Sequence, residues 1–185
     1  MKHDPYDENL PPAPSFRIAG GDVFDGKEIP RQNASEGAGG GGVSPRLSWY
    51  GFPDETRSFV VTMYDADAPT PSGFWHWVVA DIPASVMELP AGAGTAGDSG
   101  LPAGARHLRN DAGVRGYVGP APPPGHGPHR YFIAVHAVDV ESLGVDDDAS
   151  PAYLSFALLG HTLARAVIVP WFESESLEDE ESKAA

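Results

Sequence analysis

The sequence predicts one mainly β domain with a single late helix, and three observations lead to that fold class. The chain contains 22 glycines and 19 prolines, about a fifth of its 185 residues. Helix interiors tolerate these residues poorly, whereas turns between strands favour them. Several short segments rich in β-branched and aromatic residues are bounded by turn residues, as strands are. A chain of this length typically buries about 70% of its unfolded surface, so one domain can form a core unaided.

Three segments are the strongest strand candidates: residues 58–64 (SFVVTMY), 74–82 (FWHWVVADI) and 130–140 (RYFIAVHAVDV). The continuous apolarity of 74–82 predicts a strand covered on both faces. Strand alternation there predicts His76 on the face opposite Trp75 and Trp77. Weaker candidates lie earlier in the chain, at residues 15–19 and 44–49.

The late helix is expected to begin at Ser150, which is suited to cap it, with Pro151 at the first helical position. Apolar residues then recur at helical spacing as far as Ala164. Before it, residues 83–129 form a long stretch rich in Gly and Pro. A connection of this length inside a compact domain is uncommon unless it is functional.

The ends of the chain are expected to lie outside the packed domain, which we place at residues 15–172. Residues 1–14 are predicted to be an extended, proline-rich arm, and residues 173–185 an acidic, disordered tail. The GAGGGG segment at residues 37–42 is predicted to be a flexible loop.

The formal net charge is −14, and the last fifteen residues contribute −5 of it. This balance argues against a general nucleic-acid binder, which needs Lys and Arg to displace counterions from phosphates. Cysteine is absent, which excludes disulfides and thiolate chemistry. The polar start, MKHDPYDENLPP, does not resemble a signal peptide, and the most apolar stretch, 152–169, is interrupted by charge. We therefore expect a soluble, cytoplasmic protein.

Two motifs could carry chemistry. Asp65 and Asp67, within YDADAP, follow a strand directly, although alone such a pair is more typical of an Asx turn with solvated acids. The segment GYVGPAPPPGHGPHRY places His129, Arg130 and Tyr131 at the start of a predicted strand. Their side chains can all donate hydrogen bonds to a phosphate or carboxylate. The alternative is an ordinary surface crossover. His76, taken alone, is more typical of hydrogen-bonded filler than of a catalyst.

The order and spacing of SPRLSW, DADAP, GFWHWVVADIPA and YVGPAPPPGHGPHRY, across residues 15–172, resemble the phosphatidylethanolamine-binding protein family. The closest resemblance is to its bacterial Raf-kinase-inhibitor-like branch. It implies a β-sandwich with a central antiparallel sheet, a second sheet and a few peripheral helices. It also implies a small pocket at one end of the sandwich for phosphate or phosphorylated and phospholipid head groups.

The resemblance assigns eight ligand-binding residues: Asp65, Asp67, His76, Gly119, Pro122, Pro123, His129 and Tyr131. The two prolines wall the pocket, and Arg130 is structural. The family pattern also implies a cis bond before Pro69. A hydrogen bond donated to an aspartate would fix a pocket histidine's tautomer and favour its protonated form, which can hold an anion.

The favoured hypothesis is a binding module without catalytic residues, cofactor or metal. A protease or kinase target and a homodimer are further expectations from the resemblance. One alternative is a hydrolase or isomerase that uses Asp65 and His76 as an acid–base pair. A metal held by those two residues with Asp67 and His129 would be an option in that case. The other alternative is a structural or interaction protein with a vestigial pocket.

Overall fold

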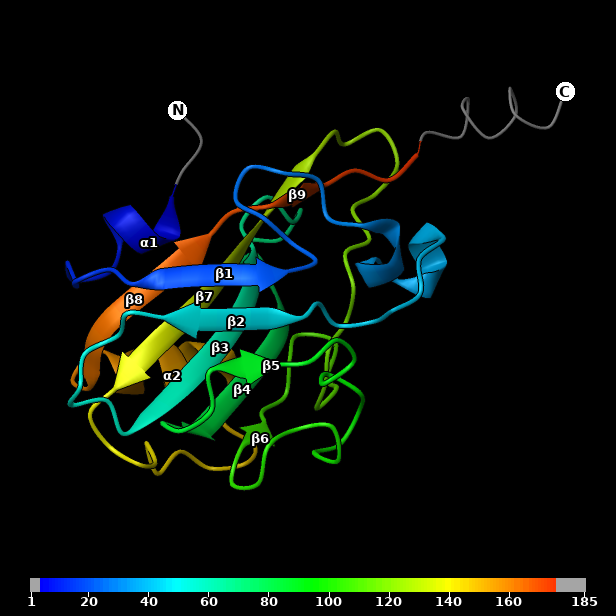
Figure 1. The fold of residues 1–185 in the computed structure, drawn as a ribbon. Coiled ribbons are helices and arrows are strands. Elements are labelled where there is room, and N and C mark those ends of the chain that lie inside the picture. The colour runs from blue at the N-terminus through cyan, green and yellow to red at the C-terminus, as the bar shows by residue number, and fades with distance from the viewer. Residues whose placement is uncertain (1–3, 176–185) are drawn as a thin grey trace, which may run out of the picture.

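The computed structural model describes residues 4–175, and within them the chain forms two antiparallel sheets (Figure 1). The smaller sheet has the order β1-β2-β5, and the larger has the order β6-β4-β3-β7-β8, with β9 also paired to β7. The strands are β1 (Arg17–Gly21), β2 (Leu47–Tyr50), β3 (Ser58–Asp65), β4 (Phe74–Pro83), β5 (Glu88–Leu89), β6 (Arg106–His107), β7 (His129–Val138), β8 (Thr162–Ile168) and β9 (Trp171–Phe172). The mainly β fold predicted from the sequence is confirmed.

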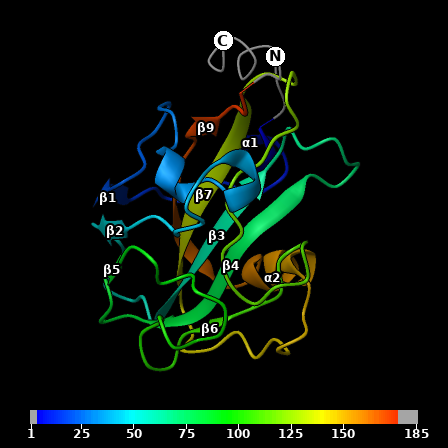
Figure 2. The same cartoon turned by 90° about the vertical axis from the view of Figure 1, so that its right-hand side faces the viewer.

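The smaller sheet covers one face of the larger sheet, and helix α2 (Pro151–Leu158) covers the other (Figure 2). Alternation along β3 sends Val61 and Met63 into the main core between the sheets, and Val60 into a second cluster beneath α2. Leu154 and Leu158 of α2 complete that second cluster. The larger sheet is therefore covered on both faces, as the continuous apolarity of residues 74–82 predicts.

Strand β4 contains a bulge at His76. Met63 of β3 pairs with Trp77 and Tyr64 pairs with Trp75, so His76 is an extra residue between two registered pairs. A bulge of this kind shifts the alternation by one position. Trp77 consequently lies in the main core, whereas Trp75 packs on the α2 side. The prediction that both tryptophans share one face is wrong for this reason.

Helix α2 begins where the sequence predicts, since the Ser150 hydroxyl accepts a hydrogen bond from the Tyr153 N–H at 3.2 Å. It ends at Leu158, six residues before the predicted end. The following residues form β8, which pairs with β7 along its length. Burial along β8 alternates with a period of two, so strand pairing overrides the helical spacing that extends to Ala164.

The predicted arm is not extended throughout. Residues Pro5–Glu8 form the one-turn helix α1, capped by Asp4, whose carboxylate accepts from the N–H groups of Tyr6 and Asp7. The glycine loop also contains order: 3₁₀ turn η2 (Glu36–Ala38) follows η1 (Arg31–Asn33), and the Gly42 N–H donates to the Ala34 carbonyl. Most of the predicted acidic tail, residues 176–185, lies outside the described residues.

In the part of the chain that the structure describes, no helix has both the length and the apolar character required to cross a bilayer.

Candidate functional site

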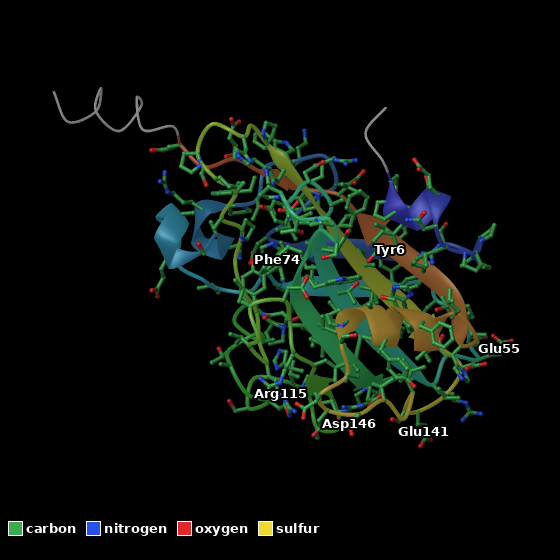
Figure 3. All side chains as sticks on the ribbon, turned by 180° about the vertical axis from the view of Figure 1, so that it is seen from behind. Tyr6, Glu55, Phe74, Arg115, Glu141 and Asp146 are labelled. Carbon is green, nitrogen blue, oxygen red and sulfur yellow. The ribbon has the colours of Figure 1, made fainter. Side chains whose placement is uncertain are left out.

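The end of β3 and the starts of β4 and β7 meet at one end of the larger sheet. Because β4 and β7 both run antiparallel to β3, the end of β3 lies beside the start of each. Asp65 is registered with Phe74 on one side and with Tyr131 on the other. Figure 3 labels Phe74, which marks this end of β4. Segments that are distant in the sequence are thereby brought together.

A cavity of about 270 Å³ opens at this end of the sheet. Six of the eight residues assigned by the family resemblance line it: Asp65, His76, Gly119, Pro122, Pro123 and His129. The remaining lining residues are Ser35, Ala68, Pro69, Thr70, Phe74, Val118 and Ala121. Among residues 4–175 no lysine or arginine lines the cavity, so within this range the two histidines are its only side chains that can become cationic.

Asp65 and His129 form a buried pair. The His129 Nδ1 lies 2.8 Å from Asp65 Oδ2, and the two side chains are only 4% and 5% exposed. The other carboxylate oxygen accepts from the Asp67 N–H at 2.8 Å. Both oxygens of Asp65 are therefore engaged, and the histidine proton is held on Nδ1, which leaves Nε2 as the ring nitrogen for a ligand.

His76 is held by the backbone, not by Asp65. Its Nδ1 lies 2.8 Å from the Val118 carbonyl oxygen, which can only accept, so Nδ1 carries the proton. Burial lowers the pKa of His76, and the nearby charge of Asp65 opposes this effect without overcoming it. The imidazole is consequently neutral at pH 7. The Asp65–His76 acid–base pair of the enzyme hypothesis is not formed, because Asp65 is hydrogen-bonded to His129 instead.

Asp67 and Tyr131 do not line the cavity. Asp67 receives both Nε and Nη2 of Arg130, at 2.8 and 2.9 Å, as well as the Arg130 backbone N–H. This bidentate pair fastens the turn after β3 to the start of β7. Tyr131 is fully buried, with its ring edge-on to His76 at 5.2 Å between centroids. Tyr131 therefore packs against His76, whereas Asp67 is held by Arg130 outside the lining of the cavity.

The loop that forms one wall of the cavity, residues 118–123 (the wall loop), lies directly against the backbone of Ala34 and Ser35 at Gly119. A Cβ at this position would lie 2.4 Å from the Ser35 nitrogen and 2.5 Å from the Ala34 carbonyl carbon. The contact is reinforced by the Ser35 N–H, which donates to Pro120 O at 3.0 Å. Only glycine permits this approach without a backbone shift. Pro122 is buried in the wall, whereas Pro123 is exposed at the mouth.

The turn after β3 does not use a cis peptide bond. All peptide bonds of the described residues are trans, including Ala68–Pro69, so the cis bond implied by the family pattern is a wrong expectation. The turn is closed instead by hydrogen bonds: Asp65 accepts from the Asp67 N–H, and the Thr70 N–H donates to Ala68 O at 2.7 Å. An Asx turn of this type reverses the chain with trans geometry.

His126 and Ser35 are among the residues at or beside the site that were not predicted. His126 is exposed and lies 5.9 Å from His129 between ring centroids, and its spacing within GHGPHRY was the available signal. Ser35 lines the cavity from a segment 23 residues before the start of β3, and no local pattern marked it. No cluster of three or more His, Asp or Glu suited to a metal ion occurs among residues 4–175.

Comparison with known proteins agrees with this architecture. The model of the family described as phosphatidylethanolamine-binding protein matches residues 19–173, and the chain belongs to that family. Its relatives include two Escherichia coli proteins. The UPF0098 protein YbhB is 44% identical over 159 residues, which cover 85% of this chain and 99% of YbhB. The UPF0098 protein YbcL is 41% identical over 163 residues, which cover 87% and 89%.

Solved structures give the same result. The crystal structure of E. coli YbcL, described as a new member of the mammalian PEBP family, aligns with a TM-score of 0.82 over 86% of this chain and 98% of that chain. A putative PEBP homologue from Chlamydia trachomatis, CT736, aligns with a TM-score of 0.74 at 27% identity, over 88% of this chain and all of that one.

Proposed function

We propose that the cavity at the end of β3 binds a small anion, either phosphate or the phosphorylated head group of a larger ligand. The observation that carries this proposal is the pair of histidines at one cavity, each with Nδ1 committed to a protein acceptor. Each ring then has only Nε2 to offer a ligand. A protonated Nε2 is a charge-assisted donor, the kind of group that binds phosphate oxygens well.

The family supports the same ligand class, since its name refers to a phospholipid with a phosphorylated head group. The size of the cavity also fits. Its 270 Å³ corresponds to about nine water molecules at ~30 Å³ each, enough for a head group but not for the two long acyl chains of a whole phospholipid. The chain's net charge of −14 disfavours extended polyanions, whereas a single phosphate responds to the local field of the site.

Anion binding at this cavity is coupled to proton uptake. Because burial lowers the pKa of His76, the empty site holds a neutral imidazole at pH 7. An anion favours the charged form, so binding takes up a proton and strengthens as the pH falls. Sulfate is the suitable probe, since it stays a dianion between pH 5 and 8, whereas phosphate itself titrates.

The test is calorimetric titration of the full chain with sulfate, phosphate and phosphorylethanolamine, with the His76 and His129 imidazole signals followed by NMR. We expect saturable shifts of both rings at millimolar ligand, and tighter sulfate binding at pH 5.5 than at pH 7.5. The variant His129→Ala should lose binding at least tenfold. His161→Ala is the matched control, because His161 pairs with Asp139 beyond the opposite end of β7.

Absence of any shift at millimolar ligand, or equal binding by His129→Ala, would overturn the proposal. A preference for phosphorylethanolamine over phosphate would indicate a head-group ligand, and equal affinity would indicate free phosphate. A protease or kinase target, a homodimer and a cytoplasmic location stay predictions drawn from the sequence.

A further inference from the structure

A second cavity, of about 260 Å³, lies on the opposite face of the larger sheet. Its floor is formed by β3, β4, β7 and β8, one wall by α2 and the other by the N-terminal segment 5–13. Figure 3 is seen from this side and labels Tyr6, which belongs to α1. None of its lining residues belongs to the first cavity. The two sites are therefore separated by the sheet itself.

The N-terminal wall is anchored by Tyr6. Its ring stacks on Phe132 at 5.7 Å between centroids, and its hydroxyl lies 3.2 Å from Thr62 Oγ1. Further along the wall, the Arg165 N–H donates to the Pro14 carbonyl at 2.9 Å. These contacts fix both ends of the segment against the sheet, so the cavity is a built feature of the fold.

Most of the lining is apolar. Leu10 and three prolines form the N-terminal wall, Leu158 and Leu159 form the α2 wall, and Trp75 contributes from β4. Polar side chains lie on the floor, with Thr62, Thr162 and His136, and also on the two walls, with Asn9 and Ser155. Burial lowers the pKa of His136 to about 3, so this ring is neutral and adds no charge. An apolar pocket with a few polar groups is the usual form of a small-molecule site.

Arg165 is the one cationic side chain that the described part of the chain contributes to this lining. Its Nη2 makes only long contacts, 3.4 Å to Tyr6 O and 3.3 Å to Pro11 O, and its guanidinium lies 5.7 Å from the Tyr6 ring centroid. It forms no ion pair with any carboxylate of residues 4–175. Burial consequently lowers the pKa of Arg165 despite the distant charges of Asp4 and Asp7. A partly buried guanidinium without a bound carboxylate favours an anionic ligand group.

We propose that this second cavity binds an amphipathic monocarboxylate, with the carboxylate on Arg165 and a compact aromatic or short aliphatic body against Leu10, Leu158 and Trp75. A volume of about nine waters at ~30 Å³ each suits a body of this kind. Arg pairs with carboxylates through two parallel N–H···O bonds, which is the recognition its planar fork provides. The site is distinct from the anion cavity and does not depend on the function proposed for it.

The test compares benzoate and octanoate with benzyl alcohol and 1-octanol, each titrated into the full chain at pH 7 while the Trp75 indole signal is followed by NMR. The carboxylates should bind at least tenfold more tightly than the matched alcohols, because charge-assisted hydrogen bonds are the stronger kind. Arg165→Gln should abolish this preference, whereas Arg165→Lys, which keeps the charge but lacks the planar fork, should retain only part of it.

A second variant, Leu10→Trp, fills the cavity without altering the charge and should abolish binding of both ligand classes. His129→Ala, which affects only the first cavity, should bind benzoate as the parent chain does; loss of benzoate binding in that variant would assign the carboxylate to the first cavity. Equal affinity for acids and alcohols, or unchanged acid binding by Arg165→Gln, would overturn the proposal. Thermal unfolding of each variant confirms that the fold is intact.

Discussion

His129 and His136 lie on the same strand, β7, but face opposite sides of the larger sheet. They are seven residues apart, and an odd separation on a strand places two side chains on opposite faces. His129 pairs with Asp65 at the first cavity, whereas His136 lies on the floor of the second. One strand thus supplies a histidine to each cavity.

The buried His136 makes the free energy of unfolding depend on pH. Its pKa is about 3 in the folded chain and about 6.5 when unfolded, so between these values the unfolded chain binds a proton that the native chain does not. Stability therefore falls as the pH falls from 6.5 toward 3, by about 1.4 kcal/mol per pH unit for this group. Urea unfolding of His136→Gln at pH 7, 6, 5 and 4 should show a shallower decline than the parent chain.

Phe132→Leu is the control for that experiment. Phe132 lies on the same face of β7 and packs against Tyr6, but it does not titrate. Its loss of stability should be the same at every pH, so its curve should run parallel to that of the parent. Parallel curves for His136→Gln as well would contradict the assignment of the acid sensitivity to this ring.

The Asp65 carboxylate should stabilise the fold more by accepting hydrogen bonds than by filling space. Asp65→Ala removes the acceptor for the His129 Nδ1 proton, which becomes a buried donor without its partner, and for the part-buried Asp67 N–H. We expect a loss of about 2–4 kcal/mol in the free energy of unfolding. Asp65→Asn keeps an acceptor oxygen and should lose less than half of that, as measured by chemical denaturation. Equal losses would show that the acceptor is not what stabilises this edge.

Much of the larger sheet could be predicted because its central strands are buried on both faces. Residues 58–64, 74–82 and 130–140 are each within two residues of an observed strand at both ends. The helix start at Ser150 was also predictable, since capping is a local interaction. Its end was not, because the strand pairing of β8 with β7 is a non-local interaction that overrides local spacing.

The site was predictable in its composition but not in its connections. The family motifs gave six residues that line the cavity. They did not show that Asp65 forms its hydrogen bond with His129 instead of His76. That pairing follows from the bulge in β4 and from the hydrogen bond of His76 to the Val118 carbonyl. Ser35 was also beyond local reasoning, since it is brought to the cavity by the approach of its backbone to Gly119.

Gly119→Ala tests that approach. The added methyl would lie within 2.5 Å of two backbone atoms, so the wall loop must move. We expect a loss of about 1–3 kcal/mol in the free energy of unfolding, typical of overpacking, together with weaker sulfate binding. Gly160→Ala is the matched control, because a Cβ there meets no atom within 4 Å. It should change stability by less than about 0.5 kcal/mol. A Gly119→Ala chain as stable as this control would mean that the wall accommodates a side chain.

The pair between Arg130 and Asp67 should support the site without binding the ligand. Neither residue lines the cavity, and the guanidinium donates two hydrogen bonds to the carboxylate across the turn after β3. Arg130→Gln should therefore lower the free energy of unfolding by about 1–3 kcal/mol, since charged hydrogen bonds are lost at a partly buried position. Sulfate affinity at 15 °C, where the variant stays folded, should remain within threefold of the parent value. A tenfold loss of affinity in a folded Arg130→Gln chain would instead make Arg130 part of the binding site, and its charge would then have to reach the anion directly.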